Sequence, residues 1–214
     1  MLWGLLLCSL GIYMAIQANI GLAPWDAFSM GLSYVTNISY GDASIYTGLV
    51  IIAIDLLLRE KIGFGTLLNT ILIGKMVDLL EYVDLIPLLD NFWWGLALLL
   101  LGQGIMCVGA HYYISAAMGC GPRDSLMVAM GKRVKRIPVG LVRIFIEGSA
   151  LLCGWLMGAK VGLGTLIAAV GVGFILELVF RLYRFDVKAV RHESFLDTLR
   201  NWGLLKKSPS ASEE

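Results

Sequence analysis

Two short segments place acidic side chains next to glycine and proline in an otherwise apolar sequence. Residues 21–26 read GLAPWD and residues 119–124 read GCGPRD, so both follow the pattern Gly-x-x-Pro-x-Asp. Proline suits the first turn of a helix, and an Asp two residues later lies in the same turn, where free N–H groups and the helix dipole favour an anion. We therefore expect helices to begin at Pro24 and Pro122, each with an acid in its first turn.

The chemistry of these acids has three interpretations. In the simplest, Asp26 and Asp124 accept hydrogen bonds from the free N–H groups at the two helix starts, because no water reaches those groups inside the membrane. In the second, they line a polar site, because ionisable residues at membrane depth are costly and are functional candidates. Arg123 stands where the first segment has Trp25, so the group could bind a small zwitterion or anion, or carry a proton. In the third, Asp26 and Arg123 form a closed ion pair, and in any case we expect Arg123 to lie near Asp26.

Other polar residues interrupt the apolar runs. Arg143 and Glu147 are four residues apart on one expected helix, so they share a face and are expected to pair, although Glu147 remains a candidate proton site. Lys75 and Asp78, three apart, are expected to pair in the same way. The candidate solute- or ion-binding residues are Asp26, Arg123, Asp124, Glu147, Trp25 and Asn69.

The spacing of the remaining reactive residues does not predict a catalytic centre. No nucleophile triad and no metal-ligand spacing is present, so we expect neither an enzyme nor a bound metal or cofactor. The four cysteines form no C-x-x-C pair and are expected to be free thiols. They are Cys8, Cys107, Cys120 and Cys153.

The composition defines the elements that must position these residues. The chain is 58% hydrophobic and 15% charged, against about a quarter charged in soluble domains. Several apolar runs reach the roughly 17–25 residues that cross a bilayer, so we expect an all-α polytopic membrane protein without a cleavable signal peptide. A net charge of +1 suggests no nucleic-acid partner. The expected spans are 2–18, 43–58, 66–83, 93–115, 139–157 and 165–180.

The sequence also repeats itself. We expect a first membrane repeat over residues 1–90, a second over 91–183 and a tail over 184–214. In both copies a Gly-x-Gly-Thr segment is expected to form a tight turn with an N-capping threonine, Thr66 or Thr165. The matching pairs are Gly4 and Gly102, Gly11 and Gly109, Gly21 and Gly119, Pro24 and Pro122, Asp26 and Asp124, and GFGT at 63–66 with GLGT at 162–165.

The Pro-x-Asp segments decide the topology. Segments 24–36 and 122–131 would cover only about 15–21 Å as helices, against a hydrocarbon core of about 30 Å. If they span, the chain has eight crossings in parallel 4+4 repeats. If they are re-entrant, six crossings form inverted 3+3 repeats, and the basic residues near 59–61, in 132–136 and in the tail fall on one side. We favour the second arrangement, with Asn37 and loop 84–91 outside and an amphipathic C-terminal tail on the cytoplasmic leaflet.

These motifs together resemble one known family. GLAPWD, GFGTLLN, GCGPRDSLM and GWLMGAKVGLGT, in this order over almost all of residues 1–183, are similar to the YczE/YyaS/YitT-like family of bacterial integral membrane proteins. The resemblance implies a location in the bacterial cytoplasmic membrane and no particular activity. The second copy has Ala168 where the first has Asn69. The positions carried over by motif are Pro24, Trp25, Asp26, Gly65, Thr66, Asn69, Pro122, Arg123, Asp124, Gly164 and Thr165.

We therefore expect a small-solute transporter or permease with a polar site between two inverted halves. The bilayer and a small anionic or zwitterionic solute are its expected partners, and no oligomeric state is implied. The alternative is a membrane scaffold or accessory factor that transports nothing. An intramembrane enzyme is the weakest interpretation.

Overall fold

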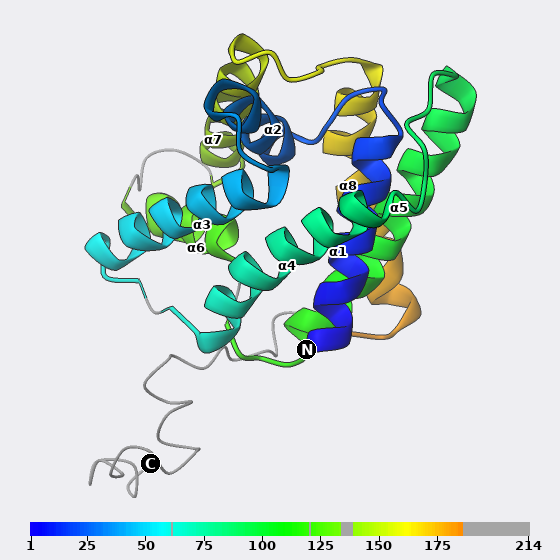
Figure 1. Cartoon of the computed structure of the whole chain (residues 1–214). Coiled ribbons are helices and arrows are strands. Elements are labelled where there is room, and N and C mark those ends of the chain that lie inside the picture. The colour runs from blue at the N-terminus through cyan, green and yellow to red at the C-terminus, as the bar shows by residue number, and fades with distance from the viewer. Residues whose placement is uncertain (61, 120, 134–138, 186–214) are drawn as a thin grey trace, which may run out of the picture.

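The structure is all-helical. The computed structural model of the chain describes residues 1–60, 62–119, 121–133 and 139–185, and these residues form eight helices and no strand (Figure 1). Helices begin at Pro24 and Pro122, as predicted from the proline motifs. The helices are α1 (Leu2–Gln17), α2 (Pro24–Thr36), α3 (Tyr40–Leu57), α4 (Phe64–Val83), α5 (Phe92–Ile114), α6 (Pro122–Arg133), α7 (Val139–Leu156) and α8 (Leu163–Leu182).

Three of the six expected spans fall on helices that meet the length and composition of a membrane span. Among the described residues, α3, α5 and α8 are long and apolar enough to cross a membrane, and α1 is apolar but shorter. Helices α2 and α6 have only 13 and 12 residues. The all-α class is therefore confirmed, with two short helices placed at the two Pro-x-Asp segments.

Helices α1 and α5 pack against each other with their backbones in contact. A Cβ atom added to Gly4 would lie 2.6 Å from the carbonyl oxygen of Gly109, and one added to Gly109 would lie 2.6 Å from the carbonyl oxygen of Gly4. Gly11 and Gly102 meet in the same reciprocal way, at 2.5 and 2.8 Å. Small residues allow such an approach where lipid supplies no hydrophobic force between helices. In Figure 1 this pair lies on the right-hand side of the bundle, next to α8.

Two turns cross to helix starts in the other half of the chain. The turn before α2 contacts the start of α8, where Gly164 N–H donates to the carbonyl oxygen of Ile20 at 3.0 Å. The turn before α6 contacts the start of α4, where Gly65 N–H donates to the carbonyl oxygen of Met118 at 2.8 Å. Each turn contains a glycine in the left-handed region, Gly21 or Gly119, with φ of +128° and +126°.

These crossings correct the prediction that Thr66 and Thr165 are N-caps. The N-cap residues are Gly63 and Gly162, and each threonine is the third residue of its helix. In each helix one of the free N–H groups of the first turn, that of Gly65 in α4 or Gly164 in α8, bonds to a carbonyl group of the crossing turn. Thr165 instead accepts a hydrogen bond from Gly162 N–H at 3.3 Å.

Loops far apart in sequence meet at the two ends of the bundle. At one end, Leu89 N–H donates to the carbonyl oxygen of Gln17, and the Asn19 side chain donates to the carbonyl oxygen of Leu89, both at 3.0 Å. Lys160 Nζ donates to Asn19 Oδ1 at 2.6 Å, so the turn before α8 joins them. Elsewhere, Arg133 at the end of α6 donates to the carbonyl oxygen of Leu58 at the end of α3.

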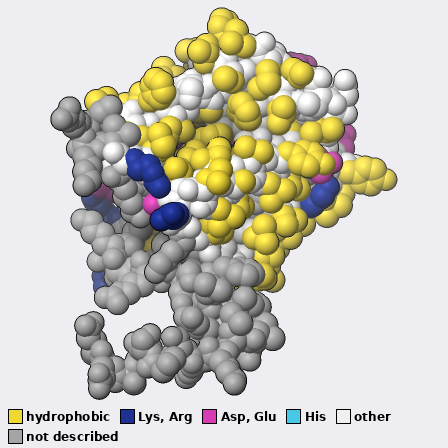
Figure 2. Space-filling model, turned by 90° about the vertical axis from the view of Figure 1, so that its left-hand side faces the viewer, with side chains coloured by type: hydrophobic (Ala, Val, Ile, Leu, Met, Phe, Trp, Pro, Cys, Tyr) yellow, Lys and Arg dark blue, Asp and Glu magenta, His cyan; other side chains and the backbone are white. Residues whose placement is uncertain are grey.

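Much of the outer surface is apolar, and several polar residues are buried. Figure 2 shows hydrophobic side chains covering most of the described surface on one face. Leu57, Phe145, Phe174 and Leu182 are each more than 70% exposed. A folded chain that turns such side chains outward is suited to a hydrocarbon solvent, in which only internally satisfied helices or barrels are stable.

Several sequence predictions lie outside the described residues. Residues 134–136 of the basic cluster, Cys120 and the amphipathic tail from residue 186 belong to this group. The other three cysteines, Cys8, Cys107 and Cys153, are free thiols, as predicted.

Candidate functional site

The starts of α2 and α6 meet at an ion pair. Arg123 Nη1 lies 3.3 Å from Asp26 Oδ1, so the predicted proximity of these two residues is confirmed. The Tyr40 hydroxyl donates to the same carboxylate oxygen at 3.1 Å. Asp26 and Tyr40 are buried, with 7% and 3% of their surfaces exposed. Three helices therefore converge on one carboxylate, and we call Tyr40, Asp26 and Arg123 the Asp26 cluster.

Asp26 is not a hydrogen-bonding cap of its own helix. Its hydrogen bonds go to Tyr40 and Arg123, and Ala23, the N-cap residue of α2, makes no side-chain cap. A charged donor forms a stronger hydrogen bond with a carboxylate than a neutral one does. The guanidinium of Arg123 therefore competes well against the N–H groups of α2, although the α2 dipole still favours the anion.

Trp25 contacts the same arginine from another side. The Arg123 Cζ atom lies 5.4 Å from the centre of the Trp25 ring, within the range of a cation–π interaction. Trp25 also lines a separate cavity of about 430 Å3 whose other walls include Phe28, Ile54 and Leu126. That cavity is predominantly apolar, so Trp25 separates the arginine from an apolar space.

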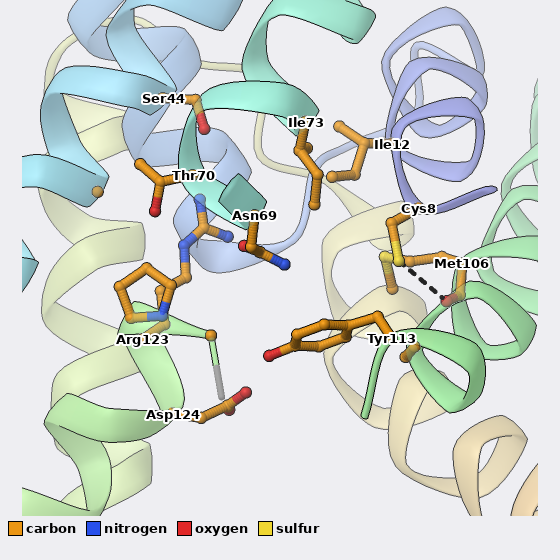
Figure 3. Close-up of a pocket in the computed structure, with 14 residues that line it drawn as sticks. Cys8, Ile12, Ser44, Asn69, Thr70, Ile73, Met106, Tyr113, Arg123 and Asp124 are labelled. Atoms are coloured by element: carbon orange, nitrogen blue, oxygen red, sulfur yellow. Dashed lines mark hydrogen bonds between the residues drawn. The ribbon is translucent and has the colours of Figure 1, made fainter. Parts of the chain in front are cut away.

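A cavity with several polar groups in a mainly apolar wall lies next to Arg123. We call it the Arg123 cavity; its volume is about 240 Å3, and residues of α1, α3, α4, α5 and the start of α6 enclose it (Figure 3). Of the predicted site residues, Arg123, Asp124 and Asn69 line it. The remaining polar groups of its wall are Ser44, Thr70 and Tyr113, and the apolar groups are Cys8, Ile12, Ile73, Met106 and Ala110.

The charged groups lie at one end of this cavity and the apolar groups at the other. In Figure 3 the Tyr113 ring points from α5 toward the start of α6, where Asp124 also lies. A Cβ atom added to Gly121 would lie 3.4 Å from both Tyr113 Oη and Asp124 Oδ2, so both groups border the same small space. The arrangement offers a cation, a carboxylate, an amide and hydroxyl groups next to an apolar wall.

Glu147 is not brought to this site. Arg143 Nε lies 2.8 Å from Glu147 Oε1, so the predicted pairing along α7 is confirmed. Neither residue lines the Arg123 cavity or the cavity beside Trp25. Thr66 and Thr165 also lie outside the cavity wall, at the crossings of the two turns.

The predicted pairing of Lys75 with Asp78 is wrong. Lys75 Nζ lies 2.5 Å from Asp42 Oδ1, on the neighbouring helix α3. Asp78 instead accepts hydrogen bonds from Gly41 N–H and from Ser39 Oγ, both at 2.7 Å. The start of α3 lies against Asp78, so Ser39 and Gly41 already donate hydrogen bonds to that carboxylate. The side chain of Lys75 pairs with Asp42 instead.

Sequence reasoning missed the tyrosines of the site. Tyr40 opens an apolar helix, and a tyrosine at that place ordinarily indicates an anchor at the membrane–water interface. Tyr113 lies in the last turn of α5, where the same interpretation applies. Ser44, one helical turn after Tyr40, was the available signal, because hydroxyl groups at i and i+4 mark a polar face on an otherwise apolar helix. Among the described residues, no group of three or more His, Cys, Asp or Glu side chains could hold a metal ion.

The chain belongs to a family of unknown function, DUF6198, which matches residues 1–181. It is 33% identical over 176 residues to "Uncharacterized membrane protein YczE" of Bacillus subtilis, covering 81% of this chain and 80% of that one. It is 29% identical over 186 residues to an "Uncharacterized protein" of Haemophilus influenzae, covering 85% and 84%, and 26% identical over 184 residues to "Uncharacterized protein YyaS" of Bacillus subtilis, covering 82% and 88%. No solved structure matches.

These matches confirm the resemblance seen in the sequence motifs. Together with the apolar helices, they place the chain among bacterial membrane proteins.

Proposed function

We propose that this protein is a small-solute transporter or permease of the bacterial cytoplasmic membrane, and that the Arg123 cavity is its solute site. The observation that carries the proposal is the cavity itself, a mainly apolar space with Arg123 and Asp124 in its wall, in a bundle whose surface suits lipid. Concave spaces with a few convergent polar groups are the usual sites of small ligands. Charged residues held inside a membrane bundle characteristically mark solute or ion pathways.

The proposal includes two inverted repeats, residues 1–90 and 91–183. In a two-fold arrangement every contact occurs twice with its partners exchanged. The reciprocal approach of Gly4 and Gly109 fits this rule. The two turn contacts also fit it, because the N–H groups of Gly65 and Gly164 each bond to a turn in the other half. Inverted repeats with short helices at their interface are a common plan of secondary transporters.

Six crossings, with α2 and α6 re-entrant, fit the contacts between loops. Eight crossings would put the 18–23 turn and loop 84–91 on opposite sides of the membrane, whereas Asn19 bonds directly to Leu89. Eight crossings would also separate Arg133 from Leu58, which are hydrogen-bonded. In the six-crossing arrangement both contacts join segments on the same side, with loop 84–91 outside and the C-terminus in the cytoplasm.

The groups in the cavity wall favour a small zwitterion over a simple anion. Arg123 can bind a carboxylate through the N–H groups that Asp26 does not use, since a guanidinium carries five donors. Asp124 and Tyr113 offer acceptors for an ammonium group, and Ile12, Ile73 and Met106 offer an apolar wall. A free amino acid with a short aliphatic side chain combines these three features in one molecule.

Uptake into liposomes tests the proposal. Purified protein is reconstituted, a pH gradient is imposed, and labelled small amino acids and carboxylates are screened for uptake. We expect uptake of a zwitterion that Asp124→Asn abolishes while the variant remains folded by size-exclusion chromatography. Asp42→Asn is the matched control, because Asp42 is an exposed acid on α3 paired with Lys75, and it should retain uptake.

If none of these solutes moves under any gradient, transport is rejected in favour of the scaffold function. Uptake that survives Asp124→Asn would instead remove the solute site from the Arg123 cavity.

A further inference from the structure

A third cavity lies beyond the Asp26 cluster. We call it the Tyr40 cavity; its volume is about 640 Å3, and it lies between the end of α1, the end of α2, the start of α3 and the end of α4. Its polar wall includes Gln17, Ser33, Asn37 and Tyr40, and Glu81 is the one acid or base among its described lining residues. Nothing in the proposed solute site uses this cavity.

The two cavities lie on the same faces of the same helices. On α1, Ile12 lines the Arg123 cavity, and Ile16, one turn later, lines the Tyr40 cavity. On α3, Ser44 lines the Arg123 cavity, and Tyr40, one turn earlier, lines the Tyr40 cavity. One turn of helix is about 5.4 Å long, so a single layer of side chains separates the two spaces along α1 and α3.

Helix α4 repeats this arrangement with one buried residue between. Ile73 lines the Arg123 cavity and Glu81 lines the Tyr40 cavity. Val77, halfway between them on the same face, is fully buried and belongs to one apolar cluster with Tyr40. The separating layer therefore has an apolar part around Val77 and a polar part, the Asp26 cluster.

The Asp26 cluster connects one cavity to the other. Tyr40 lines the Tyr40 cavity and donates to Asp26, and Asp26 accepts in turn from Arg123, which lines the Arg123 cavity. We propose that the two cavities are the two halves of one solute path, and that Tyr40, Asp26 and Arg123 form the gate that closes it in this structure. The gate gives the proposed transporter its alternating access, and in that sense the inference rests on the proposed function.

The chemistry of the gate indicates which solute opens it. The acid Glu81 in the Tyr40 cavity attracts a protonated amine, so that cavity takes the ammonium group of a zwitterion first. When the carboxylate of that solute reaches Arg123, it replaces Asp26 as the partner of the guanidinium. Asp26 then keeps its hydrogen bond with Tyr40 and loses the one with Arg123. As a result, no hydrogen bond of the cluster links α2 and α3 to α6.

Cysteine labelling tests the path without any solute. All four native cysteines are replaced by alanine, and one reporter is added, either Ser44→Cys in the Arg123 cavity or Glu81→Cys in the Tyr40 cavity. A membrane-impermeant thiol reagent is applied to right-side-out and to inside-out membrane vesicles. We expect the Glu81→Cys reporter to react only from outside and the Ser44→Cys reporter only from inside.

Removing the gate should then change one reporter only. In the Tyr40→Ala background, the Ser44→Cys reporter should become reactive from outside as well, at a rate at least tenfold above that with Tyr40 present. Tyr46→Ala is the matched control, because Tyr46 is a tyrosine of the same helix that is 58% exposed and lines neither of the two cavities. It should leave labelling unchanged.

Two results would overturn the proposal. One is labelling of both reporters from the same side with Tyr40 intact, a result that needs no gate variant to be folded. The other is a folded Tyr40→Ala protein in which the Ser44→Cys reporter remains closed from outside. Failure of uptake in liposomes with the expected labelling would reject transport and leave the two-sided path standing.

Discussion

The starts of α2 and α6 carry the same motif and have different environments. Each helix begins with proline and has an aspartate as its third residue. Asp26 is buried and bonded to Tyr40 and Arg123, whereas Asp124 is exposed and lines the Arg123 cavity. The motif thus determines where a helix begins, and the groups that face it determine what its acid does.

The two segments also differ in the residue between proline and aspartate. The two residues at this position, Trp25 and Arg123, contact each other, with the arginine 5.4 Å from the ring centre. Asp26 receives the arginine of the other start, whereas Asp124 lines the Arg123 cavity. The two segments therefore share their glycine, proline and aspartate, and their acids still have different partners.

The largest expected effect comes from breaking the Asp26–Arg123 pair. Removing one partner of a buried ion pair costs about 3–5 kcal/mol, and the partial exposure of Arg123 places Asp26→Asn and Arg123→Gln near the lower end. The double variant should recover about 1–2 kcal/mol of the summed losses. The free energy of unfolding in detergent micelles, measured by denaturant titration, gives all three values. Strictly additive losses would show that the two side chains do not interact.

The next effect tests whether the two starts are alike in their turns. Gly21→Ala and Gly119→Ala should each lower stability by about 1–3 kcal/mol, because both positions have positive φ. Each added methyl group would also lie 2.7 Å from a threonine hydroxyl, Thr165 or Thr66. Gly104→Ala is the control, since a Cβ atom there meets nothing within 4 Å, and it should cost no stability. A large loss of stability in one variant and none in the other would show that the two turns do not make equivalent contacts.

A smaller loss is expected from the tryptophan. Trp25→Leu removes the cation–π contact with Arg123 and should lower the free energy of unfolding by about 0.5–2 kcal/mol. Trp93→Leu serves as the control, because Trp93 is 74% exposed on α5 and far in sequence from the site. If both substitutions cost the same, the contact between Trp25 and Arg123 contributes nothing specific.

The smallest change in stability is expected at the second aspartate. Asp124→Asn should cost about 0–1 kcal/mol, the range typical of exposed charges, although the proposed function predicts that it abolishes uptake. Thermal unfolding of the purified variant beside Asp26→Asn gives the direct comparison. A loss at Asp124 as large as that at Asp26 would make both acids structural and remove the contrast between the two starts.

The features predicted correctly from the sequence depend on local chemistry or on charge. Proline at Pro24 and Pro122 signals a helix start without information from the rest of the chain. The pairing of Arg123 with Asp26 was predictable because an arginine in apolar surroundings needs an acid, and Asp26 belongs to the matching Pro-x-Asp segment. The pair of Arg143 and Glu147 follows from helical spacing alone.

The features missed depend on how distant segments lie against each other. Thr66 and Thr165 are not caps, because carbonyl groups from turns far away in sequence already satisfy the helix starts. Lys75 pairs with Asp42 because of how α3 and α4 are aligned against each other. The spacing of residues within α4 gives no information on that alignment. The role of Tyr40 required knowing that α2 and α3 converge on one carboxylate.

The glycine contacts between α1 and α5 also bear on biosynthesis. Gly4 meets Gly109, so α1 leaves the ribosome about a hundred residues before its partner α5, or roughly 5–20 s of translation at the usual rates. During that interval the glycine surface of α1 has no helix to pack against, either in the membrane or in the insertion machinery. Nascent chains that end before α5 should therefore be recognised by quality-control proteases as incomplete, and the two halves should reach a protected state only together.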